Sequence, residues 1–321
     1  MSMVTGALRA RALRKDSHIR SFVGWPGSAR RVGTQQTGGV STAAAGVRRL
    51  REITLVSCGD DRSVLARVRQ IPLGQNSAVT LVRLLPIRVE SEVRSATEAD
   101  LRSVLEAMAG ALPEARVSAE LRSAADGADL TSTALQRPEL VVLSGPDDWR
   151  RPHKCRRVVE ETLRHGVPVL ILSGGAVEPY RRLLIAIESP EQRSSRGIEL
   201  ARALAPSAPD VHILHVVDRA LERRMARAGA PYRAIRSVRR EFRATTRRNL
   251  MSWLSTSPEA RVGLDSGDAT GAILEAARRI GPDLITLGVE DRWLREWPWG
   301  GSVASNILRD AAADVLIIRT R

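Results

Sequence analysis

Two stretches of the sequence decide the fold, and each surrounds a short run of strand-forming residues. Residues 281–293 are Gly-Pro-Asp-Leu-Ile-Thr-Leu-Gly-Val-Glu-Asp-Arg-Trp, and residues 137–149 are Arg-Pro-Glu-Leu-Val-Val-Leu-Ser-Gly-Pro-Asp-Asp-Trp. In both, Pro and an acidic residue precede the run, and Trp follows it. Strands that are buried on both faces of a parallel sheet appear as continuous apolar runs. The two stretches therefore predict equivalent internal strands in a duplicated unit.

The rest of the chain repeats the same alternation of short apolar runs and longer helical patterns. We expect strands at residues 53–57, 78–84, 116–121, 140–143 and 167–172, and again at 183–187, 211–217, 260–264, 284–287 and 315–318. Helical patterns lie between them, for example at 192–205, 269–279 and 302–311. This order predicts an α/β protein with two doubly wound five-stranded parallel sheets in tandem.

Length and composition restrict the class of protein. The chain has 321 residues, of which 43% are hydrophobic and 3% aromatic, so it can bury a core in each of two domains. We expect a disordered basic tail at 1–50, a first domain at 51–176 and a second at 179–321. No apolar run reaches the length of a membrane helix. Two cysteines, Cys58 and Cys155, cannot form a disulfide scaffold, which predicts a cytoplasmic location.

The positive charge is uneven along the sequence. The net charge is +14, and residues 1–51 contribute +9 of it through ten basic residues and one acidic residue. Of the 50 basic residues, 48 are Arg, a bias that indicates codon usage more than selection for phosphate contacts. We therefore expect no nucleic-acid partner. The helical pattern at 231–254, with seven Arg and one apolar face, is interpreted as a solvated basic surface.

The sequence lacks the main signatures of catalysis. It contains neither a Gly-Lys pair for a phosphate-binding loop nor a Gly-x-Ser-x-Gly nucleophile turn. His212 and His215 are three residues apart on a predicted strand, so they face opposite sides and cannot share a metal ion. We therefore expect a protein that is not an enzyme and has neither a catalytic residue nor a metal site.

Four segments of the second half, in order, resemble the universal stress protein family. They are the predicted first strand with its turn at 182–189, the second strand at 212–218, the helix and strand at 267–288, and the last helix and strand at 301–318. The resemblance implies strand order 3-2-1-4-5 in each domain and association of the domains through their last strands. It is fainter in the first half, where the expected ligand site is degenerate.

The resemblance also implies an adenine-nucleotide site in the second domain. Nucleotide-binding members carry Gly-x2-Gly-x9-Gly-Ser/Thr, and here Asp291 stands in place of the second glycine. Such a carboxylate 4 Å from a phosphate charge costs about 4 kcal/mol at an effective dielectric constant of 20, so AMP-like ligands are penalised less than ATP. Mg²⁺ would accompany ATP. The expected site residues are Glu188, Val216, Leu287, Gly288, Asp291, Gly301, Ser302 and Val303.

Three functions remain open at this point. The first is a non-catalytic stress-response regulator that binds ATP or AMP. The second is a nucleotide-free interaction module, with Trp293, Trp297 and Trp299 as anchors for a protein partner, or a homodimer through the last strands. The third is a weak ATPase that uses the same loop.

Overall fold

The computed structural model describes most of the chain after residue 48. The described residues are 49–57, 61–85, 90–123, 138–144, 154–174, 178–187, 195–205, 208–217, 220–254, 260–290 and 303–320. We call residues 49–174 the first half and residues 178–320 the second half. Within the described ranges no helix is both long and apolar enough to cross a membrane.

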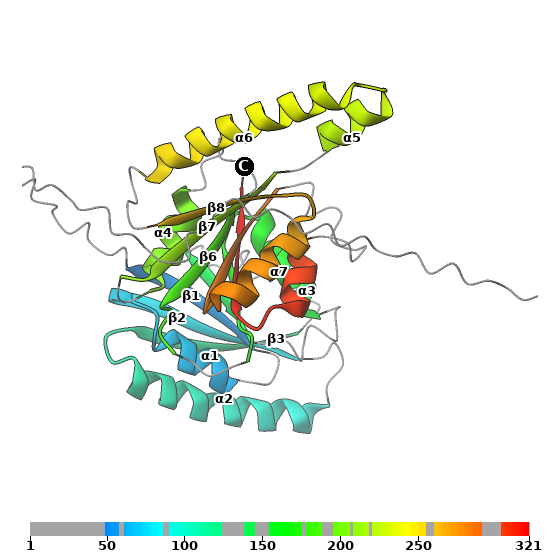
Figure 1. Ribbon diagram of the computed structural model, residues 1–321. Coiled ribbons are helices and arrows are strands. Elements are labelled where there is room, and N and C mark those ends of the chain that lie inside the picture. The colour runs from blue at the N-terminus through cyan, green and yellow to red at the C-terminus, as the bar shows by residue number, and fades with distance from the viewer. Residues whose placement is uncertain are drawn as a thin grey trace, which may run out of the picture. The chain divides into compact units, whose positions relative to one another are not determined.

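The described strands form one ten-stranded sheet in the order β3-β2-β1-β4-β5-β10-β9-β6-β7-β8 (Figure 1). The first half contributes β1 (Leu50–Ser57), β2 (Leu73–Leu85), β3 (Arg116–Ser123), β4 (Leu140–Leu143) and β5 (Val169–Ile171). The second half contributes β6 (Arg182–Ile187), β7 (Asp210–Val217), β8 (Arg261–Ser266), β9 (Leu284–Val289) and β10 (Asp314–Arg319). Every predicted strand overlaps one of these.

Helices connect the strands of each half. In the first half they are α1 (Asp61–Val68), α2 (Ser91–Ala111) and α3 (Lys154–Arg164). In the second half they are α4 (Ser195–Ala203), α5 (Ala220–Arg227), α6 (Tyr232–Leu254), α7 (Ala269–Ile280) and α9 (Val303–Asp310). The helical patterns of the sequence coincide with α4, α6, α7 and α9.

Both halves have the predicted strand order 3-2-1-4-5, and all strand pairs within a half are parallel. The predicted association through the last strands is confirmed, because β5 and β10 pair with each other. This pair is antiparallel and places Val315 opposite Ile171. The two five-stranded sheets, expected in tandem, are therefore joined at their edges into one.

Apolar side chains form one core cluster on each face of the sheet. The first cluster includes residues of α1, α2, α4 and α6 together with β-strand residues of both halves. The second includes residues of α3, α7 and α9. Both faces are thus covered, which explains why the strands appear as continuous apolar runs in the sequence.

The acidic residue of each fold-deciding stretch has a structural role. The Asp283 carboxylate accepts hydrogen bonds from the backbone N–H groups of Arg181 and Arg182, both at 2.8 Å. In the first half the Glu139 carboxylate accepts one from the backbone N–H of Arg51, also at 2.8 Å. Each acid therefore fixes the start of the first strand of its half beside the fourth strand. This is a physical reason for the repeat.

Candidate functional site

The candidate site lies at the carboxyl edge of β6 and β9, where the strand order of the second half reverses. β6 pairs with β7 on one side and with β9 on the other, and all three run parallel. Ala186 lies opposite Leu287, and Ile187 lies opposite His215. Ligands of open α/β sheets bind beyond the carboxyl ends of strands at such a reversal point.

The structure brings three of the expected site residues to one apolar cluster. Leu287 is buried in the cluster that covers the α7 and α9 face. Val216, at the end of β7, and Val303, the first residue of α9, are half-buried and pack against the same cluster. These side chains come from positions that are far apart in the sequence, and the start of α9 and the ends of β7 and β9 all border this cluster.

Gly288 is half-buried directly after Leu287, and Thr320, the residue that follows β10, explains why it is glycine. A Cβ at this position would lie 2.8 Å from the Cγ2 of Thr320, closer than side chains normally approach. The backbone N–H of Thr320 donates to the Val289 carbonyl at 2.8 Å, which holds Thr320 at the strand end. The Thr320 Oγ1 has no partner among the described residues. Sequence analysis overlooked Thr320, because only the pairing of β9 with β10 places it there.

The other expected site residues lie outside the described residues. These are Glu188, Asp291, Gly301 and Ser302, together with Trp293, Trp297 and Trp299. Their roles stay predictions.

His215 is a second residue at this edge that sequence analysis did not assign to the site. Its ring is 4% exposed, and Nδ1 lies 2.9 Å from the Ile187 carbonyl oxygen. Burial lowers the pKa of His215, although the hydrogen bond to Ile187 acts in the opposite direction. The imidazole therefore stays neutral near pH 7. In the described part of the chain, no group of three or more His, Cys, Asp or Glu residues could hold a metal ion.

The first half places charged groups at the equivalent edge. Ser57 pairs with Arg83 as Ile187 pairs with His215, so Arg83 occupies the position of His215. Its guanidinium forms an ion pair with Asp61, and Nη1 lies 2.6 Å from an Asp100 carboxylate oxygen. The side chains of Arg83 and Asp61 are 9% and 7% exposed. A buried ion pair thus replaces the neutral imidazole of the second half.

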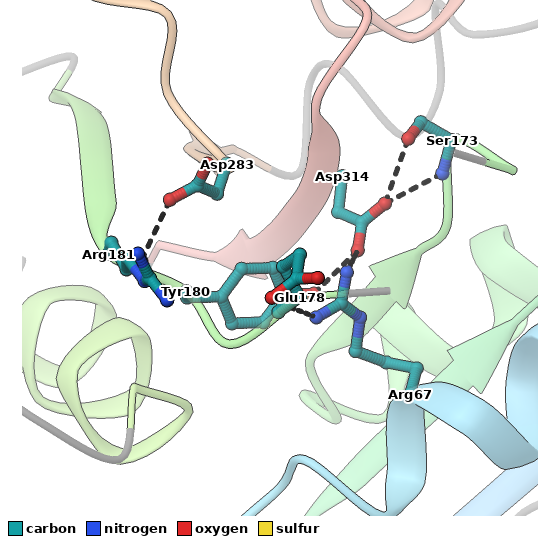
Figure 2. A network of polar contacts seen from close by, with 7 residues as sticks. All are labelled: Arg67, Ser173, Glu178, Tyr180, Arg181, Asp283 and Asp314. Carbon is teal, nitrogen blue, oxygen red and sulfur yellow. Dashed lines mark hydrogen bonds and ion pairs between the residues drawn. The ribbon is translucent and has the colours of Figure 1, made fainter. Parts of the chain in front are cut away.

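A polar network joins the two halves and centres on Asp314, the first residue of β10 (Figure 2). Arg67 of α1 places Nη2 2.8 Å from the Asp314 carboxylate and donates from Nη1 to the Glu178 carbonyl at 2.6 Å. Ser173 donates to the same carboxylate from its backbone N–H at 2.8 Å and from its hydroxyl at 3.0 Å. The Tyr180 hydroxyl donates at 2.7 Å.

The environment of Tyr180 shows how tightly this network is enclosed. The Arg67 guanidinium carbon lies 4.2 Å from the centroid of the Tyr180 ring, which is a cation–π contact. Burial raises the pKa of Tyr180 well above its usual value, and the Asp314 charge adds to the increase. The phenol is therefore a permanent donor to Asp314. The residues of this network come from both halves, because Arg67 and Ser173 belong to the first half and Asp314 to the second. The network therefore holds the halves together and is not part of the candidate ligand site.

Comparison with known proteins supports the assignment of the second half. Residues 179–319 match the sequence profile of the universal stress protein family. No curated protein sequence matches the chain. A solved universal stress protein from Archaeoglobus fulgidus DSM 4304 is 16% identical with a TM-score of 0.55, and the match covers 83% of this chain and 98% of that one.

Two structures from Pseudomonas aeruginosa are similar to the same extent. A putative universal stress protein from strain UCBPP-PA14 is 15% identical with a TM-score of 0.55, over 84% of this chain and 94% of its own. A protein of unknown function from strain PAO1 is 15% identical with a TM-score of 0.51, over 84% and 93%. Coverage this high includes both halves, and at this level of identity it establishes the fold alone. The comparisons therefore show that residues 179–319 are similar to the universal stress protein family in sequence, and that both halves share the fold of these structures.

Proposed function

We propose that this protein is a non-catalytic stress-response regulator that binds an adenine nucleotide at the carboxyl edge of β6 and β9. The observation that supports this best is that Val216, Leu287 and Val303 all join one apolar cluster in the half that matches the universal stress protein family. An adenine ring is flat and apolar on its faces, and apolar side chains at this edge suit it.

The polar part of the ligand would extend towards α9. Helix N-termini bind phosphate because their first N–H groups are free and the helix dipole is positive there. Gly301 and Ser302 precede α9 directly, and Glu188 follows β6, where a carboxylate suits the ribose hydroxyls. ATP would bring Mg²⁺ to balance its charge and that of Asp291, whereas AMP places less negative charge near this acid. The packing of Gly288 against Thr320 gives that glycine a structural role as well.

The proposal includes no catalytic step. His215, the titratable side chain at the end of β7, is buried and interacts with the Ile187 carbonyl. Slow ATP hydrolysis is the alternative from the enzyme class, and phosphate release from ATP at the rate of buffer alone would exclude it.

Equilibrium dialysis with ATP and with AMP, together with analysis of nucleotide released on denaturation, tests the proposal. We expect the substitution Asp291→Gly to tighten ATP binding at least tenfold, which corresponds to about 1.4 kcal/mol, and to affect AMP less. Asp147→Gly, at the corresponding place in the first half, is the matched control and should change neither affinity. Unchanged ATP affinity in the Asp291 variant would show that its carboxylate points away from the phosphates.

A nucleotide-free interaction module is the remaining candidate. If no adenosine compound binds at millimolar concentration, the nucleotide proposal is wrong. The three tryptophans at 293, 297 and 299 would then be the first residues to mutate in a search for a protein partner.

A further inference from the structure

The α5–α6 hairpin concentrates positive charge on one part of the folded chain. Residues 220–254 contain ten Arg and two Glu, a net charge of +8. The remaining residues after 51, at 52–219 and 255–321, contain 30 basic and 33 acidic residues, a net charge of −3. The positive excess of the folded part therefore lies on this hairpin. Charge localised in this way, unlike a composition bias spread over the chain, is typical of a surface that binds an anion.

Five arginines form a row along α6. Arg233, Arg236, Arg240, Arg243 and Arg247 follow one another at intervals of three, four, three and four residues, which places them on one helix face. With a rise of 1.5 Å per residue, neighbours are about 5 Å apart along the axis and the row is about 21 Å long. We call these five residues the arginine row.

The arginine row has no acidic partner among the described residues, in contrast to several arginines elsewhere on the surface. Arg94, Arg164, Arg278 and Arg309 each form an ion pair with an acid on the same helix or beside it. On α6 itself, Arg239 is paired with Glu222 of α5. No member of the arginine row forms an ion pair with any residue that the structure describes. The row thus presents a line of five guanidinium groups with no internal counter-charge.

One exposed aromatic side chain accompanies the row. Tyr232 is 70% exposed and lies one helical turn before Arg236. Phe242, which is 50% exposed, lies one turn from Val238 and Thr246 and so belongs to the apolar face of α6. Arginines that follow a phosphate backbone, combined with aromatic rings on which bases stack, are the usual elements of single-strand binding surfaces.

The apolar face of α6 argues against insertion into a membrane. Thr246 and Leu250 are buried, and Ile235 and Val238 are half-buried, so the apolar side of the helix is largely covered by the protein. A helix that lies in a bilayer interface needs this face free. Ala234, Ser237 and Ala244 are exposed small residues that allow a partner to approach the helix closely.

We propose that the arginine row of α6 binds the phosphodiester backbone of a nucleic acid without reading its base sequence. The row and the backbone are linear arrays of opposite charge, and Tyr232 adds base stacking where the strand is single. The sequence analysis expected no nucleic-acid partner, because it interpreted the excess of Arg as codon usage. The proposal departs from this expectation, because the positive charge is concentrated on one hairpin and the arginine row has no ion-pair partner among the described residues. The proposal is independent of nucleotide binding at the β6–β9 edge.

Fluorescence anisotropy with labelled duplex DNA of roughly 20 base pairs and with single-stranded RNA of the same length tests this, using the full chain. The row variant carries Arg→Gln at 233, 236, 240, 243 and 247. The control variant carries Arg→Gln at 94, 164, 261, 278 and 309, and therefore has the same net charge and the same basic N-terminal segment. Far-UV circular dichroism checks that both variants are folded.

We expect the wild type and the control variant to bind with a steep salt dependence, and the row variant to bind at least tenfold more weakly. Five phosphate contacts on duplex DNA give a slope of log K against log salt of about −4 to −5. Tyr232→Ala should weaken binding to the single strand more than to the duplex.

Three results would overturn the proposal. One is the absence of binding to either nucleic acid at low salt, and another is equal binding by the row and control variants. The third is a preference for another anion, seen either as competition by polyglutamate as strong as that by DNA, or as row-dependent binding to phosphatidylserine vesicles without nucleic-acid binding.

Discussion

The carboxyl edges of the two halves have the same strand order but opposite electrostatic character. At the end of the second strand, the first half buries the Arg83 guanidinium against Asp61 and Asp100, whereas the second half buries a neutral His215. At the end of the fourth strand, the first half has Ser144 where the second has Gly288. The first half has thus filled this position of the edge with a buried ion pair, whereas the second places a buried imidazole there. A duplicated fold can therefore retain its architecture while the two copies differ in the charge that they bury at the same edge.

Removal of one charge from the first-half pair should have the largest effect. Asp61→Ala leaves the Arg83 guanidinium buried with only the exposed Asp100 as partner, and we expect unfolding to require about 2–4 kcal/mol less free energy. The double variant Asp61→Leu with Arg83→Met removes both charges and should recover most of this loss. Urea unfolding followed by circular dichroism measures both.

The comparison would be wrong if Asp61→Ala and the double variant were equally destabilised. That result would mean that shape, and not charge, holds the first-half edge. Two buried atoms of this ion pair, Asp61 Oδ1 and Arg83 Nε, have no partner among the described residues. Replacement of the pair by apolar side chains removes these unsatisfied atoms, which is why we expect the double variant to regain stability.

Adding a Cβ at position 288 tests the second-half edge, and we expect it to lower stability less than Asp61→Ala does. Gly288→Ala brings a methyl group against the Thr320 Cγ2 and should cost about 1–3 kcal/mol of stability through overpacking. Thr320→Ser removes that Cγ2, so the double variant should regain the loss. The matching first-half residue, Ser144, already has a Cβ. Ser144→Ala should therefore cause no comparable loss of stability, and thermal unfolding measures this for all of the variants.

Protonation of His215 should give the smallest effect. Because burial lowers its pKa in the folded state, the unfolded chain binds more protons below about pH 6.5. Stability contributed by the neutral ring is therefore complete above this pH and decreases as the pH falls. His215→Gln, whose amide can still donate to Ile187, should flatten this part of the stability profile.

The matched control in the first half is Arg83→Gln, which should change stability by a similar amount at pH 5 and pH 7. If the stability of the wild type changed between pH 5 and pH 7 with the same slope as that of the His215 variant, the assignment of this pH dependence to His215 would be wrong.

The candidate site was predictable only in part. Val216, Leu287 and Val303 were named from the sequence, and the structure gathers them at one apolar cluster. Thr320 and His215 were not named, because their importance depends on which strands are neighbours. Nothing in the local pattern around residue 320 indicates that its methyl group approaches Gly288.

The sequence by itself determined the strands and the duplication, because apolar runs and the acid before each fourth strand are local patterns. The order of the strands within each half was implied by the resemblance to a family. Only the tertiary structure decided what these elements do together. The antiparallel pairing of β5 with β10 joined the sheets, and it brought Arg67 to Asp314 across most of the chain. Likewise, the unpaired state of the arginine row follows from where the acids lie in space. Contacts between distant residues depend on packing geometry and charge balance, which the order of residues along the chain does not display.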